Sequence, residues 1–164
     1  MVNHNNISCM TYDLRNKYKV FRLKMAEAGL PFKLTSVART VKEQVALYAQ
    51  GREHLGTVNT LREIAGLYLI GAPENKIVTW TLHSKHLIDL DDGDPKNDLS
   101  RAFDIVIINK AGKMTWDLKT DVDEDMIPDF EQAAKIGKKV GLKPGAYFLN
   151  AKGEPRPDWP HYEI

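Results

Sequence analysis

The spacing of apolar residues predicts an amphipathic helix near each end of the chain. Residues 14–28 carry apolar side chains at intervals of three, four and seven residues. These side chains are Leu14, Phe21, Met25 and Ala28. Asp13 can cap this helix and the segment GLP at 29–31 ends it, while Asp129 can cap a last helix that stops at Gly141. We expect the first helix to contribute its apolar face to the core.

Two further helices are indicated by capping boxes. The segment TVKE at 40–43 places Thr three residues before Glu and opens a helix that runs to Gly51. The segment TLRE at 60–63 repeats the pattern before the amphipathic stretch at 61–70. Arg39 is therefore expected at a turn between a strand and a helix.

Four segments have the composition of strands. KLTSV at 33–37 alternates, and both IVTWT at 77–81 and AFDIVII at 102–108 are rich in β-branched and aromatic residues. NKAG at 109–112 has the residues of a hairpin turn. A short final strand is expected from His161 to Ile164.

The order of these elements predicts an α+β fold, a small antiparallel sheet with helices packed against it, because strands and helices do not alternate regularly. Between the second and third strands, the aspartate-rich segment Asp89–Asp98 also contains Gly and Pro, which predicts an exposed loop. We find no internal repeat, so we expect one domain spanning 1–164.

Composition narrows the functional classes. Twenty-three Lys and Arg against 22 Asp and Glu give a formal charge of +1, which offers no reason to expect nucleic acid or a membrane as partner. The first ten residues lack the basic start and apolar run of a secretory signal. The lack of an intrachain disulfide framework agrees with synthesis in a reducing cytoplasm. Cys9 is the one cysteine, and a cysteine hydrolase is disfavoured because Cys9 precedes the first helix in a terminus expected to be mobile.

Three side chains that can bind a metal lie in or beside the expected strands. His86 follows the second strand, Asp104 interrupts the apolar third strand, and His161 begins the last one. Two histidines and one carboxylate form a standard catalytic zinc site, in which the fourth position holds water. The alternative for Asp104 is a salt bridge with an arginine such as Arg101, since a buried carboxylate needs a partner.

Further residues could carry chemistry beside such a metal. Asp158 precedes His161 by three residues and could take a proton from water and return it to a leaving amine; alternatively, it begins a surface turn. The guanidinium of Arg39 could bind a substrate carbonyl or its oxyanion. Surface or structural roles are assigned to His4, His54 and His83.

These residues occur in motifs that resemble a known family. The chain resembles the zinc peptidases that include D-alanyl-D-alanine carboxypeptidases, vancomycin-resistance dipeptidases and phage L-alanyl-D-glutamate endopeptidases. The matching segments are SVARTVKEQVALYAQGR at 36–52, Ser84-Lys85-His86, Ala102-Phe103-Asp104 and DWPHYE at 158–163.

The resemblance implies a hedgehog/DD-peptidase-like fold and a complete set of site residues. It implies one zinc ion on His86, Asp104 and His161, Asp158 as catalytic base, Arg39 as stabiliser of the transition state, and Ser84 as a substrate contact. It favours a phage endolysin that cuts the L-alanyl-D-glutamate bond of the peptidoglycan stem peptide. Such a protein is expected to be a monomer, made in the host cytoplasm and released to the wall in the periplasm.

Two departures from the family pattern stand out. Seventeen residues separate His86 from Asp104, where the pattern has six, and the Asp89–Asp98 loop accounts for the difference. Its aspartates could bind Ca²⁺, although a solvated acidic loop is the simpler interpretation. The aromatic-Gly-Gly stretch before the final motif is altered at 144–146, which bears on the edge of the substrate cleft.

Two other functions remain open. A D-alanyl-D-alanine carboxypeptidase or dipeptidase would use the same metal site on another bond of the wall. A non-catalytic module would keep the fold and zinc and bind wall peptides. The combination of Asp158 and Arg39 favours an enzyme over a binding module.

Overall fold

An antiparallel sheet lies at the centre of the fold in the computed structural model, which describes residues 6–90 and 92–164. Its strand order is β1-β4-β7-β6, and β5 pairs with the far end of β4. The strands are β1 (Phe32–Ser36), β4 (Ala102–Ile108), β5 (Met114–Thr115), β6 (Lys143–Pro144) and β7 (His161–Glu163). Two short strands, β2 (Arg39–Thr40) and β3 (Leu87–Ile88), form a separate parallel pair.

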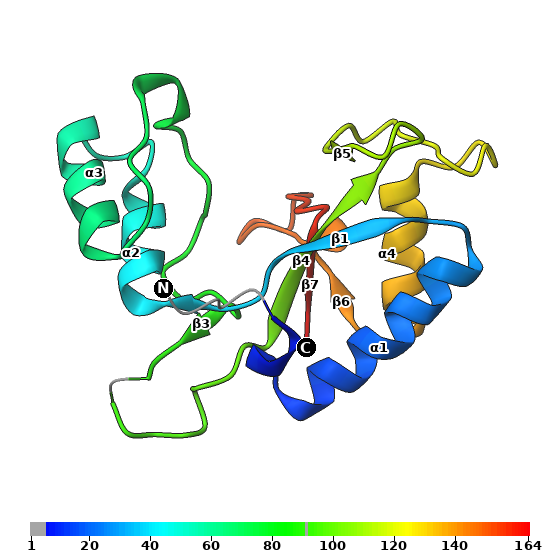
Figure 1. The fold of residues 1–164 in the computed structure, drawn as a ribbon, viewed down its shortest axis with the longest axis horizontal. Helices are drawn as coiled ribbons and strands as arrows, with labels where there is room; N and C mark the ends of the chain where they lie inside the picture. Colours follow the sequence, from blue (N-terminus) through cyan, green and yellow to red (C-terminus); the bar gives the residue numbers. More distant parts are fainter. Residues whose placement is uncertain (1–5, 91) are drawn as a thin grey trace.

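The helices fall into two groups (Figure 1). α1 (Tyr12–Glu27) and α4 (Asp129–Lys139) contact each other and lie beside the sheet. α2 (Val41–Ala49) and α3 (Leu55–Ile64) form a second pair away from it. The short 3-10 helices are η1 (Ile7–Cys9), η2 (Ala72–Glu74) and η3 (Gly145–Tyr147). This arrangement confirms the α+β class.

Alternation along β4 separates the core from the opposite face of the sheet. Phe103, Ile105 and Ile107 are fully buried and share one hydrophobic cluster with side chains of α1 and α4. Because successive strand residues point to opposite faces, Asp104 points away from this cluster. Tyr162 of β7 stacks on Phe103, so β7 follows the same alternation.

Three of the four helices are found where they were expected, with two N-caps that differ, but the helix expected at 61–70 is displaced toward the N-terminus. α1 is capped by Thr11, whose hydroxyl accepts from the Leu14 N–H, and not by Asp13, which lies in the first turn. α4 has no side-chain cap, because both carboxylate oxygens of Asp129 accept from the Val122 N–H instead.

The third difference concerns both ends of α3, which stops at Ile64 and not at Ile70. This helix begins at Leu55 with His54 as its cap, six residues before the expected position. Thr60 therefore lies inside the helix, where its hydroxyl donates to the Gly56 carbonyl. The capping box at 40–43 is confirmed at the start of α2.

The expected strand at 77–81 is not a strand. Ile77, Val78 and Trp80 are exposed, and the segment is held by side chains rather than by a neighbouring strand. The buried Gln44 of α2 donates from Nε2 to the Thr79 hydroxyl at 3.2 Å and to the Thr81 carbonyl at 2.6 Å. The β-branched and aromatic residues at 77–81 therefore belong to a surface segment and not to the sheet.

The remaining strand predictions are confirmed. β1 overlaps the segment at 33–37, β4 matches 102–108, and the turn at 109–112 leads into β5 with the Asn109 N–H donating to the Lys113 carbonyl. In the described residues, no helix is both long and apolar enough to cross a membrane. His4 lies outside the described residues.

Candidate metal centre

Asp104 and His161 are brought together by the register of two neighbouring strands. β4 and β7 are antiparallel, and Asp104 lies directly opposite His161. Directly opposed residues have their Cβ atoms roughly 5 Å apart on the same face of a sheet. His161 Nδ1 consequently lies 3.1 Å from Asp104 Oδ1. The alternation that buries Phe103 and Tyr162 thus places both polar side chains on the other face.

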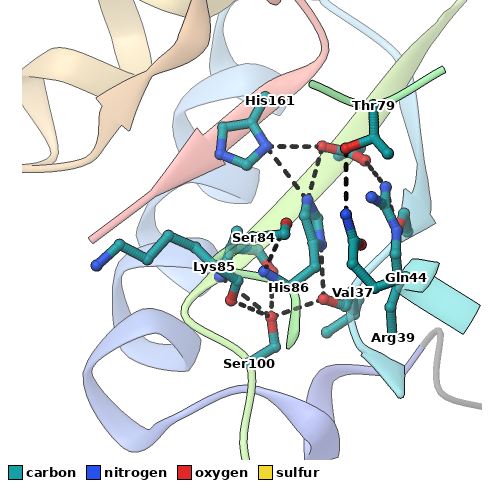
Figure 2. A network of polar contacts seen from close by, with 12 residues as sticks. Val37, Arg39, Gln44, Thr79, Ser84, Lys85, His86, Ser100 and His161 are labelled. Carbon is teal, nitrogen blue, oxygen red and sulfur yellow. Dashed lines mark hydrogen bonds and ion pairs between the residues drawn. The ribbon is translucent and has the colours of Figure 1, made fainter. Parts of the chain in front are cut away.

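His86 reaches the same point from the β2–β3 pair. Its carbonyl accepts from the Arg39 N–H at 2.9 Å, which fixes the backbone just before β3. Its ring is almost fully buried, and Nε2 lies 3.1 Å from Asp104 Oδ1 and 3.2 Å from His161 Nδ1. Figure 2 shows the ring of His86 between the Val37 carbonyl and His161. Three segments distant in sequence therefore meet, as the sequence predicted.

The hydrogen bond made by the outer nitrogen of each imidazole determines whether the inner nitrogen carries a proton. His86 Nδ1 lies 2.7 Å from the Val37 carbonyl, which can only accept, so Nδ1 carries the proton. His161 Nε2 lies 3.1 Å from the Glu163 carboxylate and donates to it in the same way. When both rings are neutral, each directs a lone pair toward Asp104 Oδ1. A metal ion bound to these three atoms, or a proton on one of the rings, would compensate the electron pairs that face one another.

The donor set fits zinc. The ligand atoms of His86, Asp104 and His161 lie within 4.8 Å of one another, and the three closest separations are 3.1, 3.1 and 3.2 Å. A tetrahedral zinc ion with bonds of 2.0–2.1 Å separates its ligand atoms by about 3.3 Å. Nitrogen, nitrogen and carboxylate oxygen are also ligand types that zinc prefers.

Arg39 holds the other oxygen of Asp104. Its Nη2 donates to Asp104 Oδ2 at 3.1 Å and to the Ser36 hydroxyl at 3.3 Å. Asp104 therefore does form an ion pair with an arginine, but the arginine is Arg39 and not Arg101. Burial alone would raise the pKa of the Asp104 carboxyl, but attraction and hydrogen bonds from His86 and His161 outweigh it and lower the pKa. Asp104 is thus ionised, as a carboxylate that binds a metal must be.

The same contacts raise the pKa of His161, whereas they lower that of Asp104. Burial lowers the pKa of its imidazole, but hydrogen bonds to Asp104 and Glu163 raise it to about 9. Without a metal, a proton on this ring supplies the positive charge that the two carboxylates attract. The Glu163 carboxyl has a lowered pKa because, although burial opposes ionisation, the His161 hydrogen bond favours it.

Asp158 lies at the cleft beside this centre. Its side chain keeps access to solvent, yet the surrounding protein removes part of its hydration and raises its pKa, with repulsion from Asp104 adding to the effect. His161, His86 and Arg39 attract the carboxylate and oppose the shift. A carboxylate with a raised pKa is a better proton acceptor.

Gly145 fixes the segment that carries both Asp158 and His161. The Gly145 carbonyl accepts from the Asp158 N–H at 2.8 Å. A Cβ atom at residue 145 would lie 2.4 Å from the Asp158 carbonyl oxygen and 3.0 Å from the His161 Cβ. Only glycine allows this approach. Within the altered stretch at 144–146, Gly145 therefore supports the segment that carries Asp158 and His161.

A cleft of about 700 Å³ opens on the centre. The three candidate metal-binding side chains and Asp158 form one part of its lining, and Trp80, Trp116, Phe148 and Arg156 form another. Ser84 also lines it, and its hydroxyl accepts from the His86 N–H at 3.2 Å. Ser84 thus supports a ligand, in addition to its expected place beside a substrate. His83 lines the cleft as well, whereas His54 caps α3.

The residues that sequence reasoning missed are mostly supports of the ligands. Val37 acts through its backbone, which no residue type reveals. Glu163 could have been found, because it lies two residues after His161 in a strand and must share its face. Cys9 is partly buried in η1 and is not among the residues of the cleft, so the chain at Cys9 is packed and not an open terminus.

Other acidic residues lie apart from this centre. Among the described residues, a second group of carboxylates consists of Asp121, Asp123 and Asp129. The described part of the Asp89–Asp98 loop forms no such group, and Asp91 lies outside the described residues. The Ca²⁺ hypothesis for this loop stays a prediction.

Comparisons with known proteins give one distant relationship. No family model matches the chain. A similar protein is the peptidoglycan L-alanyl-D-glutamate endopeptidase CwlK of Bacillus subtilis (strain 168), which is 24% identical over 139 residues. The match covers 85% of this chain and 64% of that protein, so the chain spans somewhat less than two thirds of the relative's length. The chain is thus distantly similar to a wall peptidase and carries a group of side chains able to hold a metal.

Proposed function

We propose that the chain is a zinc-dependent peptidoglycan peptidase that hydrolyses the L-alanyl-D-glutamate bond of the stem peptide. The convergence of two imidazole lone pairs and one ionised carboxylate at the floor of an open cleft carries this proposal. The distant similarity to an endopeptidase of that specificity supports the choice of substrate. In this proposal residues 1–164 form one catalytic domain of the hedgehog/DD-peptidase-like fold.

His86, Asp104 and His161 would hold the zinc ion. When bound at such a site, zinc polarises a carbonyl and lowers the pKa of water. Val37 and Glu163 hold the outer nitrogens of the two imidazoles, and Arg39 holds the outer oxygen of Asp104. Such supports fix the orientation of metal ligands.

Asp158 would move the proton. As water adds to the amide carbon, the Asp158 carboxylate accepts one proton from it, and a new C–O bond forms. Asp158 then returns this proton to the amide nitrogen as the C–N bond breaks, so that the amine leaves neutral. Arg39 lines the same cleft, and its guanidinium would donate to the oxygen on which negative charge develops. No covalent enzyme intermediate is needed.

The Asp158→Asn variant tests this assignment. We expect it to bind one zinc ion per chain, because Asp158 is not a ligand, and to lose hydrolysis of purified peptidoglycan by a factor of about 10² or more. In the wild type, the acid limb of kcat/KM should lie above the ordinary aspartate pKa of 3.8, because the surrounding protein raises the pKa of Asp158. Unchanged turnover in the variant would remove Asp158 from the mechanism.

The cellular role extends the proposal. We infer a phage endolysin that acts as a monomer, is made in the host cytoplasm and reaches the wall in the periplasm after release. The test is lysis of permeabilised bacteria by the purified protein, before and after chelation and zinc restoration. Fragments that begin with D-glutamate would support the endopeptidase, whereas released D-alanine or D-alanyl-D-alanine would support the carboxypeptidase or dipeptidase.

A further inference from the structure

One end of the cleft carries a positive charge that no acidic side chain neutralises. The Arg156 guanidinium lies over the ring of Trp80, with its central carbon 3.9 Å from the ring centroid. Both residues line the cleft that contains the metal ligands. Within residues 6–90 and 92–164, no carboxylate lies within ion-pair distance of Arg156. Its charge is therefore available to a ligand.

The position of Arg156 is fixed relative to the metal centre through Phe148. The Arg156 N–H donates to the Phe148 carbonyl at 2.8 Å. The Phe148 ring packs against His161, with ring centroids 5.5 Å apart. Arg156 is thus linked through Phe148 to one of the three candidate metal-binding side chains, and it lines the same cleft.

Trp80 is held in place from the other wall. Its neighbours Thr79 and Thr81 are bound by the buried side chain of Gln44. Arg52 adds a hydrogen bond from Nη2 to the Thr79 carbonyl at 3.0 Å and lies 5.9 Å from the Trp80 ring. The exposed segment at 77–81 thus has an anchored backbone, and it presents Trp80 as a platform for Arg156.

A guanidinium that packs on an aromatic ring keeps its donors available. All five N–H groups lie in the guanidinium plane, so contact through the face leaves the edge free to bind a carboxylate with two parallel hydrogen bonds. Arg52 has fewer free donors, because its Nη1 and Nη2 each already donate once, to the Tyr48 and Thr79 carbonyls. The stacking of Arg156 on Trp80 therefore favours a planar anion, such as a carboxylate, as its ligand.

We propose that Arg156, stacked on Trp80, binds a free carboxylate of the substrate next to the scissile amide. This inference rests on the proposed function, and it specifies the substrate further. A glutamate whose amine is part of the scissile amide has two carboxyl groups, and a stem peptide that continues through one leaves the other ionised. Arg156 would orient the peptide as well as bind it.

Two synthetic peptides that differ in one group test the proposal. The first is N-acetyl-L-alanyl-γ-D-glutamyl-L-lysine amide, and the second carries a carboxamide in place of the free α-carboxylate. Their dissociation constants are measured by calorimetry with the zinc-loaded Asp158→Asn protein, and their kcat/KM values with the zinc-loaded wild type. We expect the carboxylate peptide to bind roughly tenfold to a hundredfold more tightly, as for a charge-assisted hydrogen bond.

Substitution of Arg156 identifies the group responsible. Adding Arg156→Gln to the Asp158→Asn protein should abolish the preference by weakening the carboxylate peptide alone, and Arg156→Lys should restore part of it. Arg101→Gln is the control, because Arg101 is exposed and does not line the cleft. Equal dissociation constants for the two peptides, or a preference that survives Arg156→Gln, would overturn the proposal. A preference that depends on Arg156 without any cleavage by the wild type would support the subsite and overturn the proposed function instead.

Discussion

Replacing Gly145 by alanine should damage the metal centre although residue 145 is neither a ligand nor a base. The new Cβ would lie 2.4 Å from the Asp158 carbonyl oxygen, 3.0 Å from the His161 Cβ and 3.1 Å from the Asp158 Cβ. Ordinary van der Waals contact begins near 3.4 Å, so the Asp158–His161 segment must move by about 1 Å. Because the obstructing atoms are mostly backbone and Cβ atoms, no side-chain rotation relieves the contact.

The size of the effect follows from this displacement. Overpacking of this kind lowers the free energy of unfolding by about 1–3 kcal/mol, which is roughly 3–10 °C in Tm for a chain of this size. A displacement of about 1 Å in a catalytic constellation lowers the rate by about 10². We therefore expect Gly145→Ala to remain folded at 25 °C but to bind zinc more weakly and to lose most of its activity.

The assay combines thermal unfolding, zinc affinity and kcat/KM on purified peptidoglycan fragments. Gly56→Ala is the matched control, because a Cβ there meets only His54 Nδ1 at 3.7 Å and residue 56 lies in the first turn of α3. That substitution should be neutral or stabilise the chain by up to about 1 kcal/mol. Zinc affinity and activity within twofold of the wild type in Gly145→Ala would refute the argument that Gly145 positions the ligand.

Three further predictions concern the ligands and the core. In chelator-treated protein, the raised pKa of His161 contributes stability that is complete below pH 6.5 and is lost as pH rises through about 9. Tm of the metal-free protein should therefore fall over that range, while zinc binding tightens and releases a proton measurable by calorimetry in two buffers. Glu163→Gln should weaken zinc binding about tenfold to a hundredfold, as measured with a competing chelator, since it weakens the hold on His161 Nε2. Tyr162→Phe should raise the free energy of unfolding by about 1 kcal/mol in denaturant titrations, because its buried hydroxyl has no partner among the described residues.

The parts of the site that could be predicted from sequence are those fixed by strand alternation. In the apolar segment AFDIVII, successive side chains point to opposite faces of the sheet. Because Phe103 and Ile105 face the core, the aspartate between them points to the other face. The same reasoning applies to His161 beside Tyr162. Register between the two strands then brings Asp104 and His161 together, so two of the three ligands follow from local pattern once β4 and β7 pair.

Other features depend on tertiary context that no local pattern contains. The segment at 77–81 has strand composition, but its apolar side chains face the cleft, and its backbone is bound by Gln44 and Arg52 instead of a strand. β propensity measures fit to a half-buried surface, and a cleft wall offers such a surface too. Similarly, α3 begins with His54 as its cap, a residue type that capping preferences do not favour.

The eleven additional residues between His86 and Asp104 are accommodated because the loop closes on itself before it reaches the sheet. The Asp89 N–H donates to the Asn97 carbonyl at 3.1 Å, so the two ends of the loop lie side by side. Ser100 then joins the chain to the site, since its buried hydroxyl donates to the Val37 carbonyl at 2.6 Å, the same carbonyl that orients His86 (Figure 2). Loop length adds only logarithmically to closure entropy, so the position of His86 depends on Ser100 and Val37 and not on the number of residues between the ligands.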